Sequence, residues 1–354
     1  MSIIITGTGR YVPEEIVGEA DFLHHEFYNA DGSRIGLPNE KIISKFRVIT
    51  GIENRRYVRA DQHTSDIGLI AARLALEQSG ADPESLDGII FAHNYGDIKS
   101  GDIQSDTVPS LAARVKYGLG IQKPSCVAFD IMFGCPGWIQ SVIVAAQFLQ
   151  NGVAKKYLVI GGETLSRVSD PHDRDSMIYA DGAAASVLEY TAQEQVGMLS
   201  TASQSHTFNE TYYLYFGESF KEGYTPGTRY IKMQGRKIYE FALKHVPQAM
   251  KQCLDQAGVA IGDLKKVFLH QANGKMDDAI IERFYKLYDL SVPEGIMPMT
   301  IHYLGNSSVA TVPTLYDIVA RGEYEGHTLQ PGDVIMFASV GAGMNINAIT
   351  YRMP

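Results

Sequence analysis

The 354-residue chain is long enough for two domains or one large duplicated domain, and with 45% hydrophobic and 20% charged residues it has the composition of an ordinary folded protein. Its net charge of −9 argues against general nucleic-acid binding and a basic membrane patch, and no apolar run approaches the roughly 18 residues of a membrane span. The three cysteines, an odd number without CxxC spacing, indicate neither a disulfide framework nor a metal site, so a reducing cytoplasm fits best.

The N-terminal segment begins with a predicted buried strand at residues 2–6. The following GTGRYVP (7–13) predicts a tight turn rather than a dinucleotide-binding loop, because Pro13 stands where that fingerprint would have its third glycine. Residues 24–41 are polar and punctuated by Gly and Pro, and we expect them to form a surface excursion.

A helix and a strand are predicted next. Thr64 or Ser65 caps a helix that ends near Gly80, and the apolar segment GIIFAHN (88–94) then indicates a strand. A similar helix–turn–strand unit occurs again in the second half of the chain.

Residues 126–152 combine a strand, a cysteine and a helix. An apolar strand leads to Cys135, and apolar residues at helical spacing follow from Trp138 to the stop at Asn151-Gly152. Pro136 fits the first helical position, where its missing N–H costs nothing. Cys135 therefore lies at the helix N-terminus, where the helix dipole favours a thiolate nucleophile. The alternative is a small buried core cysteine.

The helix–turn–strand unit occurs twice. LEQSGADPESLDGIIFAHN (76–94) aligns without gaps to LDQAGVAIGDLKKVFLHQA (254–272), and the strand KYLVIGGE (156–163) matches GDVIMFASVG (332–341) at nearly the same offset. We therefore expect an internal duplication into two similar α/β halves, residues 1–190 and 191–354, stacked about a pseudo-two-fold axis.

The duplication suggests where a site would form. Sites in open α/β sheets lie at the carboxyl ends of strands, and a pseudo-two-fold axis can bring the ends at Cys135 and His270 together. Asn306 and the Gly341–Gly343 turn are further candidates in the same half. A nucleophile, an imidazole and an amide with nearby N–H groups fit either a thiolase-like acyltransferase or a Cys-His-Asn hydrolase.

Motifs along the whole chain resemble those of the β-ketoacyl-acyl carrier protein synthase III family of the thiolase superfamily. HQAN followed by GN at this distance is the most specific of them. The matching segments are ITGTGRYVP (5–13), TGIENRR (50–56), AFDIMFGCPG (128–137), DPHDR (170–174), DGAAASVL (181–188), IKMQGRKIYEFA (231–242), HQAN (270–273), GNSS (305–308) and GAG (341–343). The resemblance implies a thiolase-like fold with five αβαβα layers.

The resemblance also implies a decarboxylative Claisen condensation. Cys135 would hold an acyl group as a thioester, and a malonyl-type or β-ketoacyl thioester on acyl carrier protein would attack it. His270 and Asn306 would donate hydrogen bonds to the extender's thioester oxygen, and the N–H groups of Cys135 and Gly343 would form the oxyanion hole.

Substrate-binding positions follow from the same resemblance. Gly235 and Asn273 match positions that contact the pantetheine arm, and Arg167 matches a phosphate-contacting arginine. Lys275 keeps a positive charge near the carrier-protein docking surface. The implied partners are acyl carrier protein or coenzyme A thioesters and a second copy of the chain, with no cofactor.

Three departures from the family pattern concern the substrate. Lys45 and Ile49 replace the Trp and Arg that clamp the adenine of coenzyme A in the priming enzymes of fatty-acid synthesis. The gate residue before Pro109, often Phe, is Val108, which should widen the acyl tunnel. The insertion at 24–41 is longer than usual. We therefore predict a medium or long acyl chain and a specialised pathway, for example resorcinol formation.

The sequence leaves alternative functions open. A thiolase is disfavoured because the last glycine turn has Met344 and no second cysteine. A transacylase that moves the acyl group to an alcohol or amine, and a non-catalytic partner subunit of a ketosynthase, remain.

Overall fold

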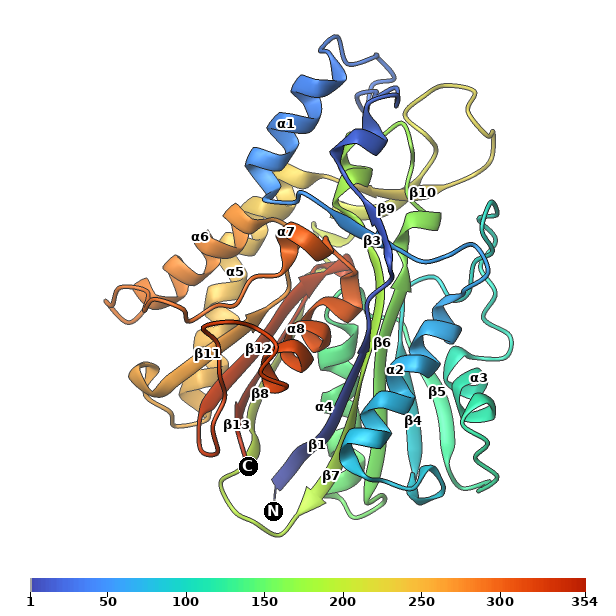
Figure 1. The fold of residues 1–354 in the computed structure, drawn as a ribbon. Helices are drawn as coiled ribbons and strands as arrows, with labels where there is room; N and C mark the ends of the chain where they lie inside the picture. The colour runs from blue at the N-terminus through green and yellow to red at the C-terminus, as the bar shows by residue number, and fades with distance from the viewer. Residues whose placement is uncertain (1) are drawn as a thin grey trace.

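The computed structural model describes residues 2–354, which form two β-sheets and the helices that cover them (Figure 1). The first sheet has five strands in the order β1 (Ser2–Tyr11), β7 (Asp181–Thr191), β6 (Lys156–Thr164), β4 (Gly88–Ala92) and β5 (Val127–Ile131). The second has four in the order β8 (Gly197–Ser205), β13 (Asn345–Arg352), β12 (Val334–Gly341) and β11 (Leu264–Leu269).

The two sheets share one topology, which confirms the duplicated α/β fold. In the first sheet β4 and β6 are parallel, and β7 and β1 continue antiparallel from β6. In the second sheet β11 and β12 are parallel, and β13 and β8 continue antiparallel from β12. The first sheet adds β5, parallel to β4, at its edge. We propose that the two halves meet near residue 190, since the sheet change from β7 to β8 supports this boundary.

Five layers alternate as helix, sheet, helix, sheet and helix. Helices α2 and α3 cover the outer face of the first sheet, α4 and α8 lie between the sheets, and α5 with α6 covers the second sheet (Figure 1). The helices are α1 (Asn39–Thr50), α2 (Thr64–Ser79), α3 (Leu111–Gly118), α4 (Gly137–Gln150), α5 (Gly235–Gln256), α6 (Gly274–Lys286), α7 (Ile301–Leu304) and α8 (Thr311–Ala320). This is the αβαβα thiolase-like arrangement.

Local signals explain the ends of α2. His63 is the cap residue, just before the two predicted candidates Thr64 and Ser65, and its N–H donates to Asp66 at 2.8 Å. The helix ends at Gly80, whose φ of +65° is the left-handed conformation that glycine adopts without strain. The predicted strand after it is β4, which is buried throughout.

The predicted turn at residues 7–13 is wrong in its first part, because β1 continues to Tyr11. Its two glycines serve close packing instead. A Cβ at Gly7 would lie 2.3 Å from the Ala75 carbonyl oxygen, and one at Gly9 would lie 2.4 Å from that of Ala71. Helix α2 therefore packs directly onto the strand backbone.

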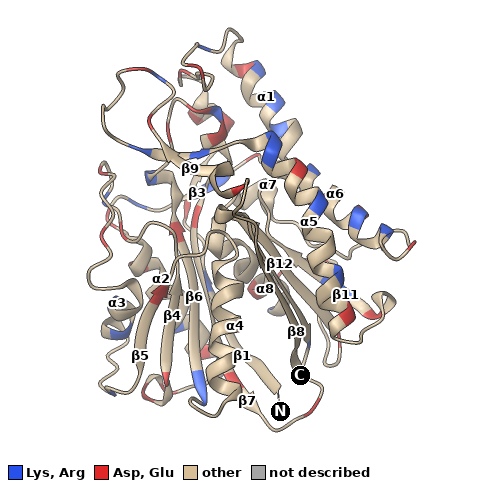
Figure 2. Cartoon of the chain, turned by 180° about the vertical axis from the view of Figure 1, so that it is seen from behind, with Lys and Arg blue, Asp and Glu red and all other residues tan. Residues whose placement is uncertain are grey.

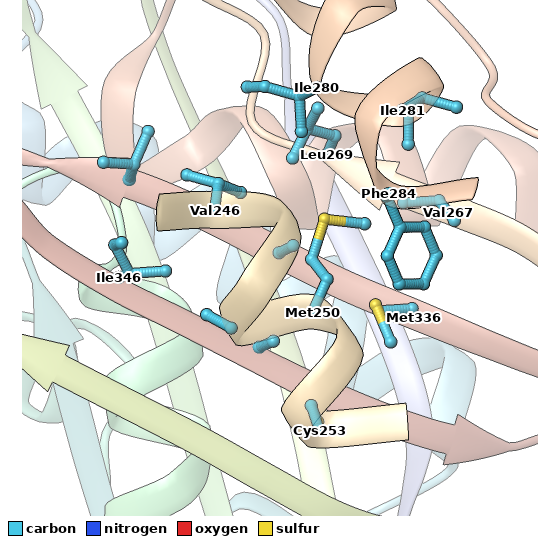
Figure 3. Close-up of a cluster of buried hydrophobic side chains, with 14 of the residues drawn as sticks. Val246, Met250, Cys253, Val267, Leu269, Ile280, Ile281, Phe284, Met336 and Ile346 are labelled. Carbon is cyan, nitrogen blue, oxygen red and sulfur yellow. The ribbon is translucent and has the colours of Figure 1, made fainter. Parts of the chain in front are cut away.

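Apolar side chains fill the space between the layers. Figure 3 shows the core between α5, α6 and the second sheet, where Met250 lies among side chains of all three. Cys253 is part of this core, and Cys126 is buried between α2, α3 and the first sheet. Within residues 2–354, no helix is both long and apolar enough to cross a membrane.

Two short ribbons lie above the sheets, at the end where the parallel strands finish (Figure 1). They pair β2 (Glu15–Val17) with β3 (Arg55–Tyr57), and β9 (Leu214–Gly217) with β10 (Tyr230–Met233). The excursion predicted at 24–41 belongs to the same end and is largely exposed, but Phe27 is buried and anchors it. This end of the molecule encloses the candidate site.

Candidate active site

Cys135 lies in the turn that joins β5 to α4, at the N-terminal end of the helix. The cap residue of α4 is Pro136, whose carbonyl accepts the N–H of Gln140 at 2.9 Å, so the prediction of Pro136 as the first helical residue is wrong by one position. Proline fits both positions because neither needs its N–H.

The glycine turn of the second half touches the Cys135 turn. A Cβ at Gly341 would lie 2.5 Å from the Cys135 nitrogen, and one at Gly134 would lie 2.6 Å from the Ala342 nitrogen. Only glycine allows the two backbones to approach this closely. This contact brings the carboxyl end of β12 against the nucleophile candidate.

The Cys135 thiol is protonated at neutral pH. Burial raises its pKa to about 11, and the hydrogen bond from the Ser308 hydroxyl offsets only part of that rise. Burial at this site therefore opposes the thiolate that the position beside the helix N-terminus was expected to favour.

His270 follows β11 directly and is held beside β12. Its backbone N–H donates to the carbonyl of Ala338 at 2.9 Å. The side chain is 3% exposed, and burial lowers the pKa of the imidazole to about 4. Among residues 2–354, no hydrogen-bond partner of its buried Nδ1 is present. The ring is therefore neutral at physiological pH and carries a single N–H.

Asn306 is fixed by hydrogen bonds at both its backbone and its side chain. Its N–H donates to the carbonyl of Ile178 at 3.1 Å, and its own carbonyl accepts the N–H of Ala180 at 2.8 Å. The side-chain Oδ1 accepts the backbone N–H of Ser308 at 2.8 Å. The amide NH₂ is thereby left as the end that can donate to a ligand.

The three predicted residues line one cavity of about 330 Å³, here called the central cavity. Most of its lining is apolar, and it lies where the carboxyl ends of parallel strands from both sheets meet. Its lining includes Asn94, Tyr95, Gly134, Cys135, Ile178, Phe216, Met233, Ile238, His270, Ala272, Met276, Asn306, Ser308, Gly341, Ala342 and Met344.

A second cavity, here called the entrance cavity, continues from the central one. Its volume is about 500 Å³, and it shares Ile178, Met233, Ile238, Ala272 and Met276 with the central cavity. Gly235, the first residue of α5, and Asn273, the cap of α6, line it as well. Both residues predicted to contact a pantetheine arm therefore lie on the path toward Cys135.

The other predicted substrate-binding residues line neither cavity. Arg167 donates to the backbone carbonyls of Ile98 and Arg59, so its predicted phosphate contact has no support from this geometry. Lys275 is exposed on α6. Val108 is 84% exposed, outside the central cavity of its own chain.

The predicted oxyanion donors differ in their placement. The Cys135 nitrogen is next to Gly341, at the edge of the central cavity. Gly343, with a φ of +74°, lies between two lining residues but is not a lining residue itself. Its role as a donor stays a prediction.

Three polar residues beside Cys135 were not identified as site residues from the sequence. Ser308 donates to the Cys135 sulfur at 3.3 Å, and Asn94 donates to the Ser308 hydroxyl at 3.2 Å. The backbone N–H of Asn94 donates to the buried carboxyl group of Glu163. Asn94 and Glu163 stand at the carboxyl ends of β4 and β6, so the strand-end rule applied to Cys135 could have found them.

Comparison with known proteins agrees with the fold. A family model described as 3-oxoacyl-[acyl-carrier-protein (ACP)] synthase III matches residues 129–207, and that of its C-terminal region matches residues 254–353. The beta-ketoacyl-[acyl-carrier-protein] synthase III of Erythrobacter litoralis is 30% identical over 98% of both chains. That of Thermosynechococcus vestitus is 32% identical over 86% of this chain and 88% of its own. The crystal structure of 3-oxoacyl-[acyl-carrier-protein] synthase III from Aquifex aeolicus superposes with a TM-score of 0.80 at 27% identity, covering 99% of this chain and 100% of that one.

Proposed function

This chain belongs to the 3-oxoacyl-[acyl-carrier-protein] synthase III family and is a ketosynthase-type acyltransferase, and on that premise we propose that Cys135 carries the acyl group while His270 and Asn306 assist the condensation. The observation that carries the proposal is the central cavity, which these three residues line together. The reaction of the family is a Claisen condensation, which forms a carbon–carbon bond between two thioesters.

In the first half-reaction the Cys135 thiol loses its proton, and the sulfur attacks the carbonyl carbon of an acyl thioester as a thiolate. A new carbon–sulfur bond forms, the donor's carbon–sulfur bond breaks, and the thiol proton leaves with the departing thiol. The transient oxyanion would be stabilised by backbone N–H groups at the Cys135 turn. Neutral His270 has too low a pKa, about 4, to serve as a strong base for this proton.

In the second half-reaction a malonyl-type thioester loses carbon dioxide. The ring N–H of His270 and the amide of Asn306 donate to its thioester oxygen, where enolate charge develops. The enolate carbon then attacks the acyl group, and the Cys135 sulfur leaves as a thiolate that is reprotonated. Removing one such hydrogen-bond donor typically costs about 10²–10³ in rate.

We propose that the thioester substrates arrive on a pantetheine arm through the entrance cavity, carried by acyl carrier protein or coenzyme A. Gly235 and Asn273 line this route. Figure 2 shows lysines and arginines along α1, α5 and α6, which flank the entrance, although the chain as a whole has a net charge of −9. Such a local basic surface suits an acidic carrier or a phosphate group. Lys275 on α6 belongs to it.

We propose a medium or long acyl chain, of the kind used in specialised lipid or polyketide pathways. The support is the apolar lining of the central cavity and a further, mostly apolar cavity of about 330 Å³ beside it, here called the side cavity. The central and side cavities share Tyr95 and Phe216 as lining residues. The two rings pack edge to face, with their centroids 4.9 Å apart. This aromatic pair separates the two spaces and is where a longer chain would pass.

We also propose that the protein is a cytoplasmic homodimer. The edge strand β5 is paired on one side only within the described residues, and Val127 and Met132 are exposed there, at 57% and 71%. An exposed apolar edge of this kind is a surface that pairing with a second copy would cover. Sedimentation at micromolar concentration should give twice the monomer mass, and a monomer would contradict the proposal.

Mass spectrometry of the intact protein tests the proposed chemistry. The protein is incubated with a panel of coenzyme A and carrier-protein thioesters of increasing chain length. We expect one acyl adduct on Cys135 for medium and long chains and none in Cys135→Ala. Adding malonyl-carrier protein should then release carbon dioxide and the condensed product. A transacylase would release no carbon dioxide, and preference for acetyl-coenzyme A over longer donors would contradict the chain-length proposal.

A further inference from the structure

Ser308 occupies an unusual position between Asn306 and Cys135. It begins the 3-10 turn Ser308–Ala310, is 4% exposed, and has a φ of +52°. A left-handed backbone is uncommon for a residue with a Cβ, and it persists only where surrounding contacts hold it. Here the Ser308 N–H donates to Asn306 Oδ1 at 2.8 Å, while its hydroxyl reaches the Cys135 sulfur at 3.3 Å.

The direction of the second contact follows from the hydroxyl's other partner. A serine hydroxyl has one hydrogen and can accept at its oxygen. The Asn94 amide donates to that oxygen at 3.2 Å, so the hydroxyl hydrogen is left for the sulfur. Asn94 therefore orients the Ser308 hydroxyl toward Cys135.

Asn94 is itself fixed by a buried carboxyl group. Its backbone N–H donates to Oε1 of Glu163, which is 1% exposed at the end of β6. The other oxygen of Glu163 is buried, and no hydrogen-bond partner is present for it among residues 2–354. Glu163 thus anchors the turn after β4 from which the Asn94 side chain projects.

We infer that Ser308 is a positioning residue for Cys135, which holds the sulfur toward the central cavity and stabilises negative charge on it through a hydroxyl oriented by Asn94. The inference rests on the proposed role of Cys135 as nucleophile. The Ser308 hydroxyl acts on Cys135, whereas the Ser308 backbone N–H holds Asn306, so the two roles of this residue can be separated.

The charge on sulfur explains why this contact matters. The resting thiol is protonated, and neutral His270 supplies no strong base, so the thiolate must form in a buried site. A hydrogen bond to a charged group is worth more than one to a neutral group. The Ser308 hydroxyl strengthens its contact as the thiolate forms, whether that thiolate is attacking a donor or leaving after condensation.

The test is the rate at which iodoacetamide alkylates Cys135, measured against pH in Ser308→Ala and in the control Ser307→Ala. Ser307 is the neighbouring hydroxyl and lines neither the central nor the entrance cavity. Because a hydrogen bond to a charged partner is lost, we expect alkylation of Ser308→Ala at pH 8 to slow roughly ten- to hundredfold, with its pH profile moved to higher pH. Ser307→Ala should match the wild type.

A second measurement separates positioning from general damage. Decarboxylation of malonyl-carrier protein by His270 and Asn306 does not require the sulfur to react. Ser308→Ala keeps the backbone N–H that holds Asn306, so its decarboxylation rate should stay near the wild-type value while acyl loading falls. Equal losses in both rates would indicate a structural role and overturn the inference.

Two further variants test the role of the Ser308 hydroxyl even if Ser308→Ala destabilises the Ser308–Ala310 turn. Ser308→Gly suits the left-handed backbone and also lacks the hydroxyl, so it should show the same slow alkylation. Asn94→Leu keeps the backbone N–H to Glu163 but removes the amide that orients the hydroxyl, and it should slow alkylation less than Ser308→Gly does. Wild-type alkylation rates in Ser308→Gly would refute the inference. Failure of the wild type to form an acyl adduct would refute the proposed function, and leave the alkylation result standing.

Discussion

The buried carboxyl group of Glu163 gives a prediction whose size follows from the structure. Its pKa rises from the usual 4.5 to about 7, chiefly because burial removes water from the carboxylate, and the hydrogen bonds from the turn after β4 offset only part of this. Ionising this group therefore costs the folded protein about 3 kcal/mol more than it costs the unfolded chain. The variant Glu163→Gln has a similar shape and no charge.

Stability falls with rising pH wherever the folded protein binds more protons than the unfolded chain does. Below pH 4.5 Glu163 is protonated in both states, and stability carries no penalty. Between pH 4.5 and 7 the unfolded chain loses the proton while the folded protein keeps it, so stability falls as pH rises, and the loss is complete above pH 7. Glu163→Gln lacks this loss. Its free energy of unfolding minus that of the wild type should therefore rise by about 3 kcal/mol between pH 4 and pH 8.

Urea titrations at several pH values measure this difference. The single tryptophan, Trp138, is buried at the start of α4 and reports unfolding by fluorescence. Any constant cost of the new amide cancels, because only the change with pH is compared. Asp181 titrates in both proteins, and because its charge adds to the raised pKa of Glu163, its contribution cancels only in part. The exposed Glu77→Gln is the matched control, and its curve should stay parallel to the wild type. A difference between Glu163→Gln and wild type that stays constant from pH 4 to pH 8 would refute the reasoning.

Three other predictions concern single contacts. Lys232→Met leaves the carboxylate of Asp170 buried without its cation, so the free energy of unfolding measured by urea titration should fall by about 3–5 kcal/mol. The double variant with Asp170→Asn removes that unpaired charge and should recover part of the lost stability. Gly341→Ala places a Cβ 2.5 Å from the backbone nitrogen of Cys135, so it should lower the free energy of unfolding by about 1–3 kcal/mol and slow acyl loading. In the control Gly262→Ala the new Cβ has open space around it, so stability and acyl loading should stay unchanged. Phe216→Ala removes one ring between the central and side cavities and should shift acyl-adduct formation toward longer chains in a mixed-donor mass assay. An unchanged chain-length profile would mean that the acyl chain does not pass this ring.

Much of the site could be predicted because its main residues belong to local patterns. A buried strand followed by Cys135 and an amphipathic helix was visible in the sequence, as was His270 at the end of the repeated strand. The duplication could be read from a gapless match of helix, turn and strand. The shared topology of the two sheets confirms it and explains why the two strand ends face each other.

Other features depended on contacts between distant segments. The sequence predicted a turn at Gly7, but α2 packs on that glycine and the strand continues. The motif that contains Ser308 was visible, but nothing near it in sequence indicated that its hydroxyl would meet a cysteine from the other half. Arg167 matched a family position, yet its guanidinium is taken up by two backbone carbonyls.

The sequence by itself determined the order of the elements, the duplication and the identity of the nucleophile candidate, because these depend on residue spacing along a few turns or strands. Tertiary structure alone decided the protonation of Cys135 and its contact with Ser308. A pKa depends on how much water the surrounding protein removes, and a hydrogen bond depends on which strand ends the sheets bring together. At Cys135 the burial created by both halves raises the pKa of the thiol, which the local strand–turn–helix pattern did not indicate.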